Sequence, residues 1–334
     1  MKRIKNLYPR LAKDENLREA FRKAARGRRM EPEVLAFGQN LTVNLERMGD
    51  QFRQRKYDLG DYHFFVIRDP KVRSICAASF PERVFHHAVM NVCETVFEKY
   101  HIFDSYACRK GKGNLRAVAR ARQFAGRNAW FLKLDIAKFF DNIDHQIALR
   151  LLGRLFGDPD LLNLFEEMLA SYHVRPGQGV PIGNLFSQHL ANFYLAHLDH
   201  WLKEERHIKP YLRYMDDCIL FAGEKKLLLQ ELAAIKCFLE DELKLELKSN
   251  IQLNRTITGV PFLGYRIFPG HVRLTTESLK RFSRKYRAYE QNYCQGQWSA
   301  RELADHLESL CSFVQNSDSL GFRRFFIERF GVLA

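Results

Sequence analysis

The chain has 334 residues, of which 46% are hydrophobic and 28% charged, a balance that excludes a largely disordered protein. Lysine and arginine total 53 against 39 acidic residues, and this net charge of +14 favours a polyanionic partner, nucleic acid before an anionic membrane. The seven cysteines are widely spaced without a C-x-x-C pair, which argues against a disulfide framework and a zinc site and favours a cytoplasmic protein. No run of about 18 apolar residues exists, which argues against a membrane span.

The first predicted element is a basic helix. In residues 1–29, apolar side chains recur at helical spacing opposite a basic face, which predicts an N-terminal helical extension. The segments that follow predict a strand, turn and strand at 62–78, an apolar-periodic helix at 81–100, and a basic loop running into a basic helix at 104–124.

The middle of the chain alternates between strands and helices. Residues 130–144 begin as a strand, because Leu132, Leu134 and Ile136 alternate with polar residues. Helices are predicted at 146–170 and 225–242, hairpins at 210–223 and 260–274, and a helical, basic remainder at 276–334. Residues 177–188 form a Gly/Pro loop, in which Ser187 is expected to cap the next helix. This order predicts a mixed α+β fold.

The most informative local motif is Tyr214-Met215-Asp216-Asp217, which lies between two apolar strand halves. Adjacent carboxylates repel each other and lose hydration when buried, so the pair needs a compensating cation. Because neighbouring strand residues point to opposite faces, we expect Asp216 to be the direct ligand and Asp217 to act less directly. Taken alone, the motif is explained equally well by an Asp-Asp turn in solvent.

Asp135 changes this balance, because it lies in an apolar strand where an unpaired carboxylate would be costly. On neighbouring strands, Asp135 and Asp216 would form a site for hard divalent cations. Oxygen ligands with open positions suit Mg²⁺ bound together with substrate phosphates. Two such ions can activate a 3′-hydroxyl and stabilise a leaving pyrophosphate.

Five ordered blocks of the sequence resemble reverse transcriptases. They lie at residues 71–84, 131–145, 179–199, 212–221 and 260–267. Within that family the chain resembles most the polymerases of diversity-generating retroelements. The loop block carries Ile182-Gly183 and Ser187-Gln188, where group II intron and retroviral-type enzymes have Gln before the Gly and Pro after the Ser.

The resemblance implies a right-hand polymerase. After the 1–29 extension, we expect fingers at 30–130, a palm at 131–270 that lends a helical segment at about 145–175 to the fingers, and a helical thumb at 271–334.

The resemblance also implies roles for individual residues. Asp135 and Asp216 would hold two Mg²⁺ ions, with the Ile136 carbonyl as an added ligand, and Asp217 would be the third catalytic carboxylate. A proton donor to pyrophosphate is not assigned, because Ile251 occupies the position where many relatives have Lys; Lys248 is the candidate substitute.

Four residues are expected to contact the incoming dNTP. Phe140 would lie under the sugar and reject a 2′-hydroxyl by shape, or else pack in the core beside Phe139. Arg73, assisted by Lys71, would grip the triphosphate, because a planar guanidinium can bind two phosphate oxygens at once. Ile182 cannot form the hydrogen bond that Gln makes in accurate relatives, so base selection would depend on pairing and shape.

A hairpin turn at Phe262-Leu263-Gly264 resembles the primer grip, where Gly would allow close approach of the primer. A plain hairpin with a buried Phe is the alternative.

These expectations combine into one leading function and two alternatives. The leading one is an RNA-directed DNA polymerase that extends a DNA or RNA primer on an RNA template, errs at template adenines, and works with a small basic barrel-shaped accessory protein. The first alternative is a domesticated or anti-phage bacterial reverse transcriptase. The second is an RNA-binding protein on an inactive polymerase scaffold, against which the joint presence of Asp135, Asp216 and Asp217 argues.

Overall fold

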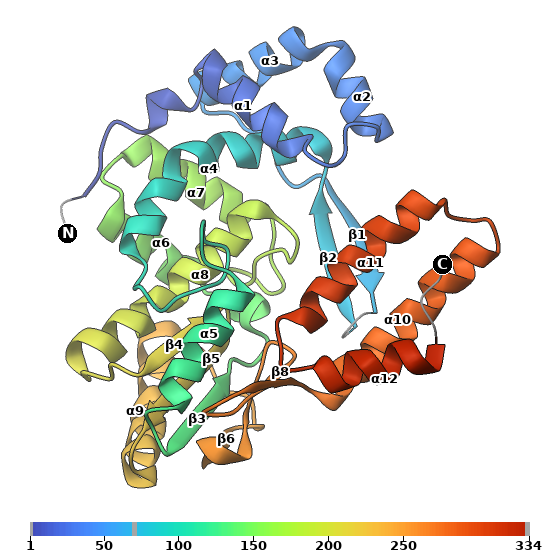
Figure 1. Cartoon of the computed structure of the whole chain (residues 1–334). Helices are drawn as coiled ribbons and strands as arrows, with labels where there is room; N and C mark the ends of the chain where they lie inside the picture. Colours follow the sequence, from blue (N-terminus) through green and yellow to red (C-terminus); the bar gives the residue numbers. More distant parts are fainter. Residues whose placement is uncertain (1–2, 69–71, 331–334) are drawn as a thin grey trace.

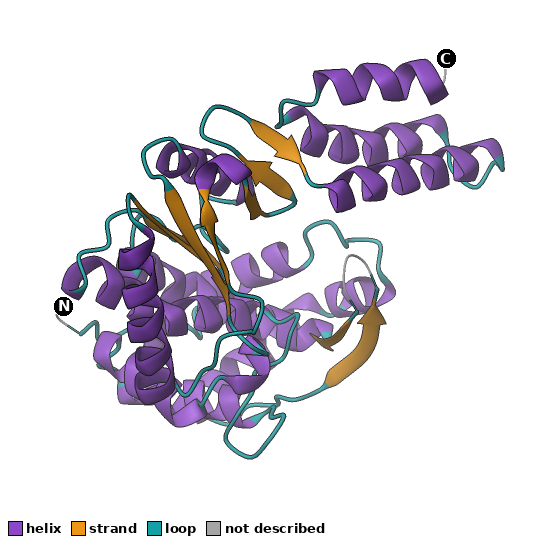
Figure 2. Ribbon diagram, turned by 90° about the horizontal axis from the view of Figure 1, so that it is seen from below, coloured by secondary structure: helices purple, strands orange, loops and turns teal. Residues whose placement is uncertain are grey.

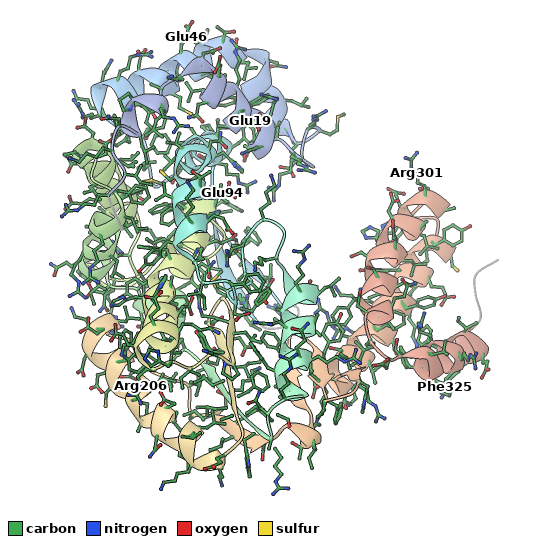
Figure 3. All side chains as sticks on the ribbon, turned by 60° about the vertical axis from the view of Figure 1, so that its left-hand side comes forward. Glu19, Glu46, Glu94, Arg206, Arg301 and Phe325 are labelled. Carbon is green, nitrogen blue, oxygen red and sulfur yellow. The ribbon has the colours of Figure 1, made fainter. Side chains whose placement is uncertain are left out.

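The computed structural model describes residues 3–68 and 72–330 and has the mixed helical and antiparallel-strand composition that the sequence predicts. Figure 1 shows N-terminal helices at one end, a central sheet surrounded by helices, and C-terminal helices that stand apart. Figure 3 shows the same separation from another side, with the C-terminal helices joined to the remainder at their base. In the described part of the chain, no helix is long and apolar enough to cross a membrane.

The N-terminal helices pack on one long central helix. Helix α1 (Asp14–Ala24) lies against α4 (Phe80–Tyr100) and buries Leu17, Ala20 and Ala24, as the helical spacing predicts. The other elements here are η1 (Tyr8–Arg10), α2 (Pro32–Gln39), α3 (Leu41–Gln54), and the antiparallel hairpin of β1 (Tyr62–Ile67) and β2 (Arg73–Ala78). The turn predicted within this hairpin, at Asp69-Pro70, lies outside the described residues.

The central sheet is antiparallel and has the strand order β4-β5-β3-β6. Its strands are β3 (Trp130–Asp135), β4 (Tyr211–Tyr214), β5 (Asp217–Ala222) and β6 (Gln252–Arg255). The predicted hairpin at 210–223 is therefore β4–β5, whereas the short β6, which pairs with β3, was not expected from the sequence. Figure 2 shows helices on both sides of this sheet, with the larger group on one side.

Alternation along β3 divides the interior into two hydrophobic cores. Leu132 and Leu134 point into a large core with the N-terminal helices and the helices behind the sheet. Phe131 points to the other side, into a smaller core with α5 (Asn114–Ala125) and the C-terminal elements. The helices of the larger core are α6 (His145–Leu155), α7 (Pro159–Ala170), α8 (Leu185–His200) with its π-helical extension η3 (Trp201–Glu205), and α9 (Lys225–Leu243).

The predicted second hairpin, at 260–274, has three strands rather than two. They are β7 (Val260–Phe262), β8 (Tyr265–Ile267) and β9 (Val272–Leu274), preceded by η4 (Thr256–Thr258). The C-terminal helices follow as α10 (Thr276–Cys294), α11 (Ala300–Gln315) and α12 (Leu320–Phe330). Caps set their starts: Thr275 accepts from Ser278 N, and Ser299 forms a capping box with Glu302.

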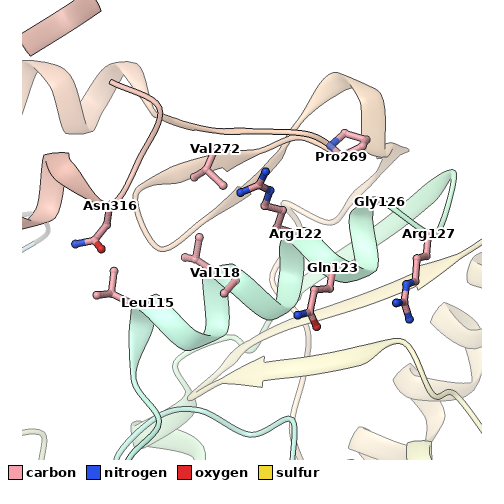
Figure 4. A pocket seen from close by; sticks show the side chains of 10 residues that line it. Leu115, Val118, Arg122, Gln123, Gly126, Arg127, Pro269, Val272 and Asn316 are labelled. Carbon is pink, nitrogen blue, oxygen red and sulfur yellow. The ribbon is translucent and has the colours of Figure 1, made fainter. Parts of the chain in front are cut away.

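A cavity of about 630 Å³ lies where α5 meets the β8–β9 loop and the link between α11 and α12. Figure 4 shows Arg122 of α5 between Val118 and Pro269 in its wall. Arg122 donates to the Gly270 carbonyl and so ties α5 to this loop. The cavity contains none of the predicted site residues.

Candidate active site

Three carboxylates meet where two neighbouring strands of the sheet end. Strands β3 and β5 pair so that Asp135 lies opposite Asp217, and β4 and β5 pair so that Tyr214 also lies opposite Asp217. The hairpin loop is therefore only Met215 and Asp216. Met215 has φ 55°, in the left-handed region that residues other than glycine seldom adopt.

Two lysines neutralise part of this negative charge. Lys248 Nζ donates to Asp135 Oδ2 at 2.7 Å. Lys133 Nζ lies 3.0 Å from Asp217 Oδ2, across the strand pair on the face that Lys133 shares with Asp135. Asp217 thus has a lysine partner, whereas Asp216 interacts with Asp135 itself.

Two of the carboxylates, Asp216 and Asp217, have raised pKa values. Burial, followed by the negative charge of Asp135, raises the pKa of Asp216 above its usual range. Burial also raises the pKa of Asp217, to about 6, although Lys133 opposes the shift. The site therefore carries more buried negative charge than its two lysines compensate.

The residues present fit a hard divalent cation. Asp135 Oδ1 and Asp217 Oδ1 are buried and have no hydrogen-bond partner among the described residues. Within the same residues, no three His, Cys, Asp or Glu side chains form a group that could hold a metal by themselves. Mg²⁺ typically takes one or two carboxylates and completes its shell with substrate phosphates and water, and the two partnerless carboxylate oxygens would suit it.

The Ile136 carbonyl faces the same region. Ala137 N donates to the Glu246 carbonyl at 2.8 Å, and the Asp135 carbonyl accepts from Lys248 N at 2.8 Å. Because backbone groups of successive extended residues point to opposite sides, the Ile136 carbonyl is directed toward β5 and the Met215-Asp216 loop.

Two of the four predicted nucleotide-contacting residues, Phe140 and Ile182, lie in one connected group. Phe139 is buried and Phe140 is half-buried, so Phe139 is the core member of the pair. The Phe140 carbonyl accepts from Val180 N at 2.9 Å, and the Ile182 carbonyl accepts from Cys76 N of β2 at 2.9 Å.

Arg73 lies apart from this group, on the β1–β2 hairpin. Arg73 is exposed at the start of β2, three residues from the Cys76 that bonds Ile182. Lys71 lies outside the described residues.

A model of the reverse transcriptase (RNA-dependent DNA polymerase) family matches residues 68–267. The chain belongs to the reverse transcriptase family. Residues 68–267 include the three carboxylates, Phe140, Ile182 and the β7–β8 turn.

The curated relatives that the chain matches are distant in sequence. A Putative COX1/OXI3 intron 1 protein of Saccharomyces cerevisiae is 24% identical over 177 residues, half of this chain and 21% of that protein. The group II intron-encoded protein LtrA of Lactococcus lactis is 27% identical over 135 residues, 39% of this chain and 22% of that protein. The chain thus spans about a fifth of the length of these relatives. Protein YkfC of Escherichia coli is 23% identical, over 68% of this chain and 72% of that protein.

A solved structure of telomerase from Candida albicans, in complex with a fragment of telomeric RNA, is similar in fold. The TM-score is 0.52 at 10% identity, over 84% of this chain and 58% of that chain. Telomerase from Candida tropicalis gives a TM-score of 0.52 over 80% of this chain and 59% of that one. This likeness confirms the predicted right-hand α+β fold.

In this reverse transcriptase the predicted primer-grip turn is tied to the first C-terminal helix. Leu263 has φ 50° and Gly264 has φ 84°. The Gly264 carbonyl accepts from Ser278 Oγ at 2.7 Å and from Thr275 N at 3.1 Å. A Cβ at Gly264 would lie 2.9 Å from Ser278 Oγ, so glycine is required by both backbone conformation and space.

The expectation for Ser187 is wrong, and two residues at or beneath the carboxylates were missed. Ser187 does not cap α8, because the helix begins earlier, at Leu185, and Ser187 is buried within it. Lys133 was not expected at the site, although period-two alternation places it on the same face as Asp135. Arg213 gave no signal, because its partners Asp199 and Asn192 lie on a separate element, α8.

Proposed function

We propose that this chain is an RNA-directed DNA polymerase that extends a primer with dNTPs on an RNA template. The observation that carries the proposal is the meeting of Asp135, Asp216 and Asp217 at adjoining strand ends of a reverse-transcriptase palm. Asp135 Oδ1 and Asp217 Oδ1 are buried there without a hydrogen-bond partner among the described residues. Charge clustering of this kind destabilises a fold unless a cation or a reaction uses it.

Asp135, Asp216 and the Ile136 carbonyl would hold Mg²⁺, and Asp217 would support them from its ion pair with Lys133. Bound there, Mg²⁺ would supply activation of the primer 3′-hydroxyl and stabilisation of the leaving pyrophosphate.

The protein's own groups would bind and orient the substrates. Half-buried Phe140 presents a rigid ring that would exclude a 2′-hydroxyl by shape. Arg73 would bind the triphosphate from the hairpin tip, with Lys71 assisting. The turn at Gly264, fixed to α10, would set the primer 3′ end.

We further propose that the enzyme is error-prone at template adenines and serves a diversity-generating retroelement. Ile182 supports this, because its side chain has no hydrogen-bonding group and its backbone is fixed to β2, so base selection depends on pairing and shape. The basic stretch at 1–29 and the helices at 276–334 are the candidate surfaces for a small basic accessory protein and a structured RNA.

The test is primer extension on an RNA template of mixed sequence, with Mg²⁺ and four dNTPs, followed by sequencing of the products. We expect DNA with errors concentrated opposite adenines, and its loss in Asp216→Ala. Asp50→Ala, which removes an exposed carboxylate from α3, is the matched control and should leave synthesis unchanged.

Accurate DNA would retain the polymerase and refute the retroelement role in favour of a domesticated or anti-phage enzyme. Synthesis that survives Asp216→Ala would refute the proposed active site. Within an error-prone enzyme, Ile182→Asn should lower errors at adenines, and an unchanged error spectrum would refute the role given to Ile182.

A further inference from the structure

A fully buried arginine lies directly beneath the carboxylate turn. Arg213 belongs to β4, two residues before Met215, and its side chain and that of Asp199 are both 0% exposed. Strand residues that carry a charge normally direct it to solvent, since burial of an ion costs several kcal/mol before any partner is counted. An arginine retained here therefore requires a reason beyond packing.

The side chain of Arg213 makes an anchor and a tether, besides one longer bond from Nη2 to Ser105 Oγ at 3.3 Å. The anchor is on α8: Nε donates to Asp199 Oδ1 at 2.7 Å, and Nη2 donates to Asp199 Oδ2 at 2.5 Å. Asn192, on the same helix, accepts from Nη1 at its side-chain oxygen (2.8 Å) and from Nη2 at its carbonyl (3.0 Å). The tether is a single bond, from Nη1 to the Met215 carbonyl at 2.9 Å.

The tether acts on the residue whose backbone is strained. Met215 has φ 55°, and a left-handed conformation costs a non-glycine residue roughly 1–2 kcal/mol. Turning Met215 back to a right-handed conformation would redirect its carbonyl and break the bond to Arg213. A charge-assisted hydrogen bond in a buried site is strong enough to oppose that change.

Helix α8 also supports the nucleotide side of the site. It begins directly after Asn184, whose side-chain oxygen accepts from Ala78 N of β2 at 3.1 Å, and after the Ile182 loop. One rigid helix thus holds the loop at its start and, through Arg213, the carboxylate turn farther along.

We infer that Arg213 is a positioning residue: anchored by Asp199 and Asn192, it holds the Met215 carbonyl and thereby fixes where Asp216 and Asp217 stand relative to Asp135. The expected effect on catalysis rests on the proposed polymerase function. The expected effect on the structure, that Arg213 orders the Met215-Asp216 turn, is independent of that function.

Two variants test the inference. Arg213→Lys keeps the positive charge for Asp199 but cannot bond Asp199, Asn192 and Met215 together in the geometry of a planar fork. The double variant Arg213→Met/Asp199→Asn removes both charges, so that no ion is left unpaired. In the wild-type chain the Tyr211 hydroxyl donates to Asp199, and the side-chain oxygen of the asparagine can still accept this bond. Arg206→Lys is the matched control, because Arg206 makes a two-pronged ion pair with Glu231 on the palm.

Three quantities are measured on the full chain: hydrogen exchange of the peptide covering 214–218 by mass spectrometry, the single-turnover rate of nucleotide incorporation, and the Kd for primer–template. We expect faster exchange in that peptide with β3 and α8 unchanged, a rate lower by about 100-fold, as misplacement by about 1 Å can produce, and an unchanged Kd. Arg206→Lys should change none of the three.

Wild-type exchange of the turn and a wild-type rate in both variants would overturn the inference. So would a general loss of protection across β3 and α8 in both, since Arg213 would then support the fold rather than the turn. If the unmodified chain makes no DNA, the proposed function fails instead, and the exchange of residues 214–218 still decides whether Arg213 holds the turn.

Discussion

Replacing Lys248 by methionine should strengthen metal binding at the carboxylate site. Lys248 Nζ lies 2.7 Å from Asp135 Oδ2, so a cation that binds Asp135 must compete with this ammonium group. Two unit charges about 4 Å apart near a protein surface interact by about 4 kcal/mol before solvation and entropy costs are counted. The Lys248 and Asp135 side chains are 38% and 24% exposed, and exposed pairs contribute ~1 kcal/mol at most.

Removal of this competitor should therefore tighten metal binding about fivefold, because about 1.4 kcal/mol corresponds to tenfold. Methionine keeps the length and apolar stem of the side chain without the charge. The assay is a titration with Mn²⁺ followed by electron paramagnetic resonance, without nucleotide or primer, so that the result is independent of catalysis.

The matched control is Lys244→Met, which removes a similar ammonium, 2.8 Å from Asp144 at the start of α6. We expect it to leave Mn²⁺ affinity unchanged. Equal or weaker Mn²⁺ binding in Lys248→Met would refute the reasoning, since Lys248 would then hold Asp135 in place for the metal rather than compete with it.

Three further predictions concern the same site. The pKa of Asp217 is raised to about 6 in the folded chain, so the folded state binds more protons than the unfolded state between about pH 4 and 6, and stability falls as pH rises through this window. Asp217→Asn should therefore raise the free energy of unfolding at pH 7.5 by about 1–3 kcal/mol in denaturant titrations. An equal gain at about pH 3, where Asp217 is protonated in both states, would contradict this cause. Phe140→Ala should raise the use of ribonucleotides relative to deoxyribonucleotides by about 10–100-fold in single-nucleotide incorporation, whereas Phe139→Ala, a core change, should reduce stability without that switch. Gly264→Ala should lower stability by about 1–2 kcal/mol and slow primer extension more than it weakens primer–template binding, and normal extension would show that the turn does not set the primer end.

The sequence predicted those parts of the site that repeat a local pattern. Alternation of apolar and polar residues placed Asp135 on a strand, and the apolar flanks of the Tyr214–Asp217 motif placed the other carboxylates on a hairpin. The paired strand ends follow from these two elements. Strand β6 was missed because it has four residues and little apolar character, and it exists because β3 offers an edge to pair with.

Contacts between distant segments could not be predicted from the sequence. The bond from Arg213 to Met215 depends on Asp199 and Asn192, which a helix brings beneath the hairpin only in the folded chain. Ser187 follows the same logic. Ser187 was expected to cap the helix, but α8 already begins at Leu185, because Phe186 and Leu190 pack in the core as part of the helix.

The division of β3 between two cores has a consequence for the carboxylate site. Leu132 and Leu134 belong to the core that the N-terminal helices complete, and Phe131 belongs to the core that α5 and the C-terminal elements complete. The strand that carries Asp135 is therefore covered by a different core on each face, and both cores are needed to shield it from water. A substitution that loosens either core, even far from the carboxylates, would change the support of the strand end that carries Asp135.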